Sequence, residues 1–285
     1  MNRRYALLAW SAAVSTYLLI VLGAVVRITG SGLGCGDHWP LCNGRLFPPL
    51  DDIGTVIEWS HRLVAALVSV LVAALAGYAV WLRRLDRLRP PPTAPDRPGR
   101  LAFVALALLI LQVGLGAVTV KLELPAWTVI LHLGTAMLLL ASLLVAASPP
   151  DPLSTSRRGG TQGVLLALAF LTVLLGALTA NLGAAAACTG FPLCNGTVWP
   201  SGPGAGLAVI QWIHRLLAYS LAAYVIWWAV RSKRRGAWGV VALVTLQVIV
   251  GAATVLLGLP PGLQAAHVAV GAAVWAGVVL TGGGR

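Results

Sequence analysis

The sequence predicts an all-α membrane protein whose eight transmembrane helices form two tandem four-helix bundles. The chain has 285 residues, 58% of them hydrophobic and only 10% charged, with a mean hydropathy of +0.86. So few charges would not cover the surface of a soluble domain. Eight apolar runs of roughly 20 residues are each long enough to cross a bilayer as a helix. Segments of the first half also recur in the second half.

The last of the eight apolar runs is the shortest. The first follows a basic start, but it is too long for the apolar region of a signal peptide and lacks a clear cleavage site, so we expect it to span the membrane. No Arg- and Ser-rich presequence precedes it, which favours a bacterial plasma membrane. The runs lie near residues 6–28, 55–82, 101–120, 125–147, 163–182, 207–230, 237–257 and 263–280.

The basic residues set the expected orientation. Fifteen of the twenty Lys and Arg residues lie at the chain ends and in alternate connections, near 83–100, 157–158 and 231–235. The positive-inside rule places these segments in the cytoplasm, so both termini are expected there. A net charge of +12 distributed in this way indicates membrane topology and argues against a nucleic-acid partner.

An internal repeat divides the chain. Cys35, Glu58 and His61 match Cys188, Gln211 and His214 at an offset of 153, and His132 matches His267 at an offset of 135. The offsets differ by about the length of the Arg/Pro-rich stretch 83–100, a predicted extended or disordered cytoplasmic loop. We therefore expect a first half of 1–82 plus 101–147, a linker at 148–162 and a second half at 163–285. With an even number of spans each, the halves should be related by a pseudo-two-fold axis along the membrane normal.

Four of the five histidines occupy matched positions in this repeat. His61, His132, His214 and His267 each lie one to two turns inside the predicted outer end of an even-numbered helix. A single intramembrane histidine is typical of a hydrogen bond between helices, but four at matched depths favour ligation. Two imidazoles per bundle suit the axial positions of a haem iron better than a tetrahedral zinc site. Each half is therefore predicted to bind one haem towards the extracytoplasmic side.

Three arginines near the outer ends of the helices have two interpretations. Arg62 and Arg215 directly follow their histidines and point about 100° away from them around the helix, so they could reach outward to haem propionates. Arg27 ends the first span and could do the same. All three could equally be interfacial charges without a ligand.

Cysteines occur only in two of the predicted outer loops. Two cysteines per loop in an oxidising compartment predict the disulfides Cys35–Cys42 and Cys188–Cys194. Their spacings of seven and six exclude C-x-x-C redox chemistry. Each bond could simply stiffen its loop, or the first could act in redox or haem handling, because that loop also contains His38, a candidate transient ligand.

The stretches "EWSHRL" at 58–63 and "QWIHRL" at 211–216 differ at one chemically decisive position. Glu58 lies on the same helix face as His61, one turn away, and its partner in the repeat is Gln211. A carboxylate there could be a wet interfacial charge, but beside a candidate haem ligand it is also a candidate proton-transfer group. Glutamine cannot exchange a proton in this range. The residues therefore predict catalysis in the first half and a structural or electron-transfer haem in the second.

These features together resemble haem A synthase, the membrane enzyme that converts haem O to haem A for cytochrome oxidases. The stretch "RITGSGLGCGDHWPLCNG" at 27–44 also fits the family's pattern, apart from His38 between Asp37 and Trp39. The resemblance implies oxidation of a ring methyl to a formyl group by successive hydroxylations. It implies Glu58 as the essential carboxylate, His61 and His132 as ligands of the substrate haem, His214 and His267 as ligands of a resident haem b, and a functional role for the Cys35–Cys42 pair.

The resemblance also implies partners. We expect a haem O synthase as substrate donor and an electron donor that the sequence does not identify, and a homo-oligomer remains open. The main alternative is a non-catalytic electron-transfer protein with two b-type haems. Such proteins usually place haems near both membrane faces, whereas all four histidines here are predicted towards the outside.

Overall fold

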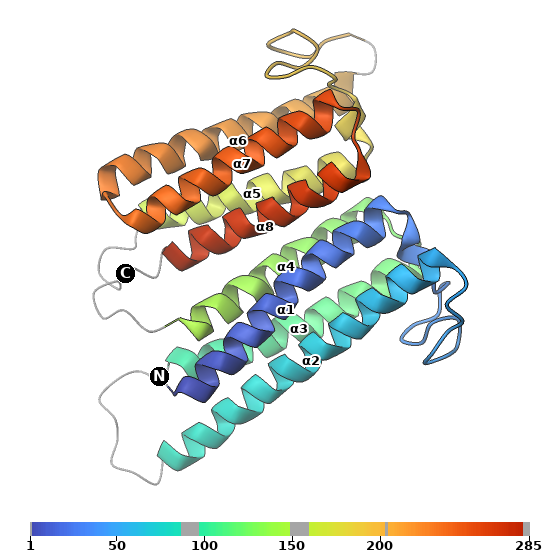
Figure 1. Ribbon diagram of the computed structural model, residues 1–285, viewed down its shortest axis with the longest axis vertical. Helices are drawn as coiled ribbons and strands as arrows, with labels where there is room; N and C mark the ends of the chain where they lie inside the picture. Colours follow the sequence, from blue (N-terminus) through green and yellow to red (C-terminus); the bar gives the residue numbers. More distant parts are fainter. Residues whose placement is uncertain (1, 87–96, 149–159, 203–204, 282–285) are drawn as a thin grey trace. The chain divides into compact units, whose positions relative to one another are not determined.

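The computed structural model describes residues 2–86, 97–148, 160–202 and 205–281, and over these residues the chain is helical (Figure 1). All eight predicted spans are confirmed as helices long and apolar enough to cross a membrane. A short 3₁₀ turn follows the first helix at η1 (Ser31–Leu33) and the fifth at η2 (Ala184–Ala186). The helices are α1 (Arg3–Ile28), α2 (Ile53–Asp86), α3 (Arg97–Lys121), α4 (Ala126–Ala147), α5 (Thr161–Asn181), α6 (Ala205–Ser232), α7 (Arg235–Leu256) and α8 (Pro261–Thr281).

The loop predicted at 83–100 is shorter than expected, because both of its ends are helical. Helix α2 continues to Asp86 and α3 already begins at Arg97. Cations in the last turn of a helix are favoured by its dipole, and Arg83 and Arg84 occupy that turn of α2. The Arg83 guanidinium also lies 5.0 Å from the centre of the Phe103 ring on α3, which ties the two helix ends together. Residues 87–96 lie outside the described part of the chain.

The contacts divide the chain into two compact units. The first contains residues 1–123 and 135–154, and within it α2 packs on both α1 and α3. The second contains 124–134 and 155–282, and within it α5, α6, α7 and α8 each pack on two neighbours and close a four-helix ring (Figure 1). The first residues of α4, up to Gly134, group with the second unit. The pseudo-symmetric tandem arrangement stays a prediction.

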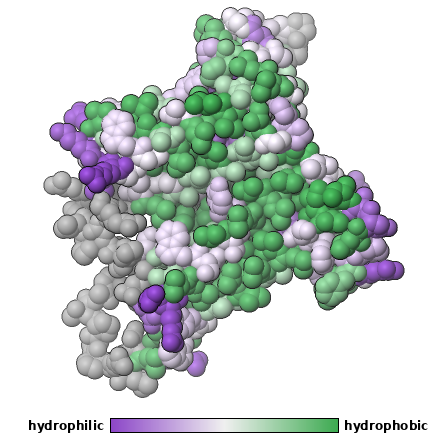
Figure 2. Space-filling model, viewed as in Figure 1, coloured by the Kyte–Doolittle hydropathy of each residue, from purple (hydrophilic) through white to green (hydrophobic). Residues whose placement is uncertain are grey.

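Small residues bring the helices of the first unit together. Helix α1 buries Tyr5, Ala9, Ala12 and Thr16 along one stripe with helical spacing, and this face packs on α2. Alanines at these positions allow the backbones to approach closely, as is usual between membrane helices. Large apolar side chains elsewhere on the helices stay exposed, and hydrophobic residues dominate the helix surfaces while hydrophilic ones gather towards the ends (Figure 2). Such surfaces suit contact with lipid.

Two loops with the same local structure follow α1 and α5. Each begins at a glycine with positive φ and passes through a 3₁₀ turn, and each later contains an Asn-Gly pair with positive φ and a β-bridge at the second cysteine. Asn and Gly tolerate this left-handed backbone better than other residues. The repeat seen in the sequence therefore extends to the backbone of the loops. The positive-φ residues that match between the loops are Gly30, Asn43 and Gly44 in the first, and Gly183, Asn195 and Gly196 in the second; Gly36 and Gly202 also have positive φ, one in each loop.

Candidate functional site

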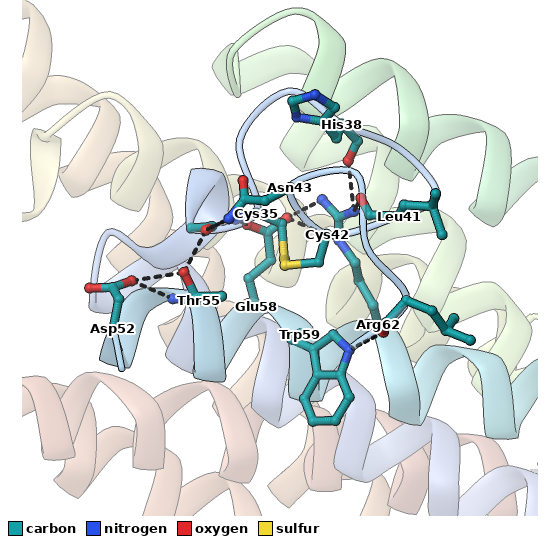
Figure 3. Close-up of a disulfide and its surroundings, with 12 residues drawn as sticks. Cys35, His38, Leu41, Cys42, Asn43, Asp52, Thr55, Glu58, Trp59 and Arg62 are labelled. Atoms are coloured by element: carbon teal, nitrogen blue, oxygen red, sulfur yellow. Dashed lines mark hydrogen bonds and ion pairs between the residues drawn. A yellow bond between two sulfur atoms is a disulfide. The ribbon is translucent and has the colours of Figure 1, made fainter. Parts of the chain in front are cut away.

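Both predicted disulfides are present, and Glu58 lies directly beneath the first (Figure 3). Cys35 and Cys42 are fully buried, and Glu58 is only 3% exposed. The Glu58 Oε2 atom accepts a hydrogen bond of 2.7 Å from the backbone N–H of Cys35. A buried carboxylate needs such donors, because it has lost its hydration. Glu58 therefore joins helix α2 to the cysteine loop, rather than forming a wet interfacial charge.

Arg62 connects the same carboxylate to the rest of the loop. Its Nε atom donates to Glu58 Oε1 at 3.1 Å, and Nη2 also donates to that oxygen. Its Nη1 atom donates to the backbone oxygens of His38 at 2.8 Å and Leu41 at 2.7 Å. The guanidinium thus clamps the loop onto α2 from the side of the helix away from His61. Arg62 thus has partners within the protein, and its contact with a haem propionate stays a prediction.

The second loop repeats this arrangement with an uncharged side chain. Gln211 is 4% exposed, and its Oε1 atom accepts a hydrogen bond of 2.7 Å from the backbone N–H of Cys188. Arg215 donates from Nη1 to the oxygens of Gly190 at 2.7 Å and Leu193 at 3.0 Å, and from Nη2 to that of Cys188 at 3.2 Å. Glu58 and Gln211 therefore have one structural task in common. Only Glu58 also pairs with its arginine, because within the described part of the chain Arg215 has no hydrogen bond to Gln211 and donates to backbone oxygens alone.

His214 on α6 and His267 on α8 face each other within the second unit. Their ring centroids are 6.5 Å apart, with ring planes at 80°. An imidazole nitrogen lies about 2 Å from a metal such as zinc and about 1.2 Å from its ring centroid, so two axial imidazoles on one iron have centroids about 6.4 Å apart. The pair therefore fits bis-histidine ligation of a haem. Among the described residues no cluster of three or more His, Cys, Asp or Glu side chains forms an alternative metal site.

The histidines of the first half fall in different compact units. His61 lies on α2 in the first unit, one turn after Glu58, and His132 lies near the start of α4 in the second unit. The Nδ1 atom of each ring is buried. Both residues thus lie within helices, and their joint ligation of one haem stays a prediction.

Arg27 and His38 lie at the edges of the candidate site. Arg27 occupies the last turn of α1, where a cation is favoured by the helix dipole. His38 is 58% exposed in the first loop, with Nδ1 3.6 Å from a carboxylate oxygen of Asp37. Lys121 Nζ, at the end of α3, lies 3.6 Å from the other oxygen of Asp37. A permanent ligand role for His38 is not supported by this exposed position.

Sequence reasoning missed the residues that hold the first loop at the start of α2. Asp52 Oδ2 accepts hydrogen bonds from Thr55 N–H at 2.7 Å and from Thr55 Oγ1 at 3.0 Å, and these bonds hold the pKa of Asp52 below its usual value. Thr55 Oγ1 also lies 2.7 Å from the oxygen of Gly34. Trp59 donates from Nε1 to the oxygen of Leu46 at 3.0 Å. The pattern Asp-x-x-Thr before an apolar run could have identified this helix cap.

Gly34 is expected to be irreplaceable in the first loop. A Cβ atom at this position would overlap the backbone of Gly54 and lie 2.7 Å from the Thr55 nitrogen, and backbone atoms cannot move aside cheaply. Gly34→Ala should therefore destabilise the loop by about 1–3 kcal/mol, as other overpacking substitutions do. We expect a lower thermal unfolding temperature and more free thiol on Cys35 and Cys42. Gly77→Ala is the matched control, because a Cβ at Gly77 meets no atom within 4 Å, and equal behaviour of both variants would contradict the prediction.

The chain is similar to proteins that act in the assembly of cytochrome oxidase. Residues 6–279 match the COX15-CtaA family model, described as cytochrome oxidase assembly protein. A Heme A synthase of Symbiobacterium thermophilum is 37% identical over 264 residues, which cover 85% of this chain and 82% of that protein. A Heme A synthase of Bacillus licheniformis is 32% identical over 291 residues, which cover 94% and 91%.

Proposed function

Because this chain belongs to the cytochrome oxidase assembly protein family, we propose that it is the membrane oxidoreductase that converts haem O to haem A. The observation that carries the proposal is the match to curated haem A synthases over most of both chains. The reaction oxidises one ring methyl of the substrate to a formyl group. The protein must therefore hold a haem substrate, handle protons beside it and bring electrons to and from the site.

A resident haem b in the second unit is the next part of the proposal. The 6.5 Å separation of the His214 and His267 ring centroids supports bis-histidine ligation there. When bound, this haem would supply one-electron redox chemistry, while the two histidines fix its position.

The substrate is proposed to bind through His61 and His132, with Glu58 as the catalytic carboxylate. Glu58 is the one member of the matched pair Glu58 and Gln211 that can take up a proton, and it lies one turn from His61 on α2. The two oxygens of Glu58 have different partners. Oε1 accepts from the charged Arg62, whereas Oε2 accepts from the neutral backbone N–H of Cys35. A proton accepted by Glu58 would weaken both contacts and loosen the loop above.

The surroundings of the reaction follow from the same proposal. The chain is a multi-pass membrane protein, and we place it in a bacterial plasma membrane with its haem sites towards the extracytoplasmic side, where disulfides persist. A haem O synthase would supply the substrate, and a separate electron donor and a homo-oligomer complete the set of expected partners. The exposed apolar helix surfaces support contact with lipid.

Expression in a bacterium that makes haem b but no haem A tests the function. With a haem O synthase present, membranes containing this chain should yield haem A or its hydroxylated precursor on chromatography and mass spectrometry. Without the haem O synthase, neither should appear, because the substrate is missing. If haem b binds but neither product forms with haem O available, the chain is a two-haem electron-transfer protein instead.

A further inference from the structure

Helix α7 presents a glutamine and a glycine to the ring of His267. Gln247 Nε2 lies 3.2 Å from His267 Nε2. Gly251 follows one turn later on the same face of α7, and a Cβ there would lie 2.9 Å from Cε1 and 3.3 Å from Nδ1 of the histidine. Real Cβ atoms do not approach other atoms this closely, so the ring occupies space that only a glycine leaves. Gln247 and Gly251 together define the position of the His267 ring.

A second glycine keeps the glutamine in place. A Cβ at Gly271, one turn after His267 on α8, would lie 3.2 Å from Gln247 Nε2. Any larger residue there would press on the amide and move it from the histidine. The space between α7 and α8 is thus shaped for the Gln247 amide as well as for the imidazole.

The other histidines share parts of this arrangement. A Cβ at Gly176 on α5 would lie 2.9 Å from His214 Cε1, and a Cβ at Gly23 on α1 would lie 3.2 Å from His61 Cε1. Gly23 and Gly176 are 153 residues apart, the same offset as their histidines. Gln112 matches Gln247 at the offset of 135 that relates His132 to His267. The contact of glycine and histidine is therefore a repeated feature, and in the sequence the glutamine recurs on α3 and α7.

The unused atoms of Gln247 and His267 indicate what the amide does. Over the part of the chain that the structure describes, Gln247 Oε1 and His267 Nδ1 are buried without a hydrogen-bond partner. A neutral imidazole that binds iron through one nitrogen carries a proton on the other, and that N–H needs an acceptor. Rotating the Gln247 amide by half a turn brings Oε1, instead of Nε2, next to the ring. Because Oε1 makes no hydrogen bond to a described residue in its present position, the rotation breaks none at that atom. Because Gln247 faces Nε2 of the ring, it is suited to accept from an N–H at Nε2, which leaves Nδ1, the ring nitrogen without a partner among the described residues, as the atom that would bind iron.

We propose that Gln247 is a positioning residue that accepts a hydrogen bond from the N–H at Nε2 of His267, the non-ligating nitrogen, and so sets the reduction potential of the resident haem. This inference rests on the proposed haem site of the second unit. An acceptor on the ring N–H makes the imidazole a stronger donor to iron, which stabilises the oxidised state. Removing the acceptor raises the midpoint potential, and a carboxylate in its place lowers it.

Potentiometric titration of haem b in the purified full chain tests this role. We expect Gln247→Leu to shift the midpoint potential upward and Gln247→Glu to shift it downward, with haem b still bound. Gln162→Leu is the matched control and should cause no shift, because Gln162 Nε2 donates to the backbone oxygen of Val278 instead of to a histidine. Optical and electron paramagnetic resonance spectra of the low-spin haem provide a second readout that is independent of activity.

The possible results separate this inference from the proposed function. Haem b with an unchanged potential in both Gln247 variants would overturn the role of Gln247 and leave the haem site intact. If Gln247→Leu is purified without haem b, Gln247→Glu decides: a potential below the wild-type value supports the role, and an unchanged one overturns it. A wild-type protein without haem b would overturn the site and this inference together.

Discussion

Glu58→Gln is expected to abolish the conversion of haem O while leaving the fold of the first loop intact. Gln211 accepts from Cys188 N–H at the same 2.7 Å that separates Glu58 from Cys35 N–H, so a glutamine can keep the loop attached to its helix. What the variant loses is the charge, the ion pair with Arg62 and the ability to exchange a proton. Loss of a general acid or base typically costs about 10²–10⁴-fold in rate. Chromatography of extracted haems should show haem O in place of haem A.

Three accompanying measurements show whether Glu58 acts chemically or structurally. Glu58→Gln should retain haem b in the optical spectrum and keep Cys35 and Cys42 oxidised in a thiol assay. Glu58→Ala, which removes the acceptor altogether, should also lower the thermal stability of the protein, because Cys35 N–H and Arg62 lose their partner. Gln211→Glu is the reciprocal control and should leave conversion unchanged. If Glu58→Gln converts haem O at the wild-type rate, Glu58 serves only to anchor the loop.

The second large effect is expected at the histidines of the second unit. His214→Ala and His267→Ala each remove one of the two facing rings, so either variant should lose nearly all of the low-spin haem b signal of the purified protein. His38→Ala is the control, because its side chain is exposed in the first loop and should leave the spectrum unchanged. Persistence of the low-spin signal in both ring-removal variants would place the resident haem elsewhere.

The sequence predicts the helices well because hydrophobic length and charge asymmetry act locally. Helix α8, the shortest predicted span, forms at Pro261–Thr281 and illustrates how reliable an apolar run of this length is. The predicted ends of the loop at 83–100 were wrong. The hydropathy pattern does not show that α2 continues to Asp86 or that α3 begins at Arg97. The two disulfides followed from cysteine spacing within each repeat.

The site was predictable only in part, because several contacts form between segments far apart in the chain. Comparison of the two repeats in the sequence shows only that Glu58 is charged and Gln211 is not. The fold shows that both side chains accept a hydrogen bond from the backbone N–H of the first cysteine in their loop. Arg62 points away from His61, as helix geometry predicts, but the loop carbonyls that it binds lie more than 20 residues earlier. The role of Gly251 cannot be inferred from the sequence, because it depends on the ring of His267 that packs against it in the folded chain.

The central claim is that the chain holds a resident haem in its second half and converts a second haem in its first. The most direct measurement is the identity and number of haems per chain in purified protein that was expressed with a haem O synthase. Extraction followed by mass spectrometry should give one haem b per chain together with haem A or its hydroxylated precursor, and His61→Ala should lose the latter while keeping haem b. Haem b alone in the wild-type protein, or loss of haem b in His61→Ala, would contradict the claim.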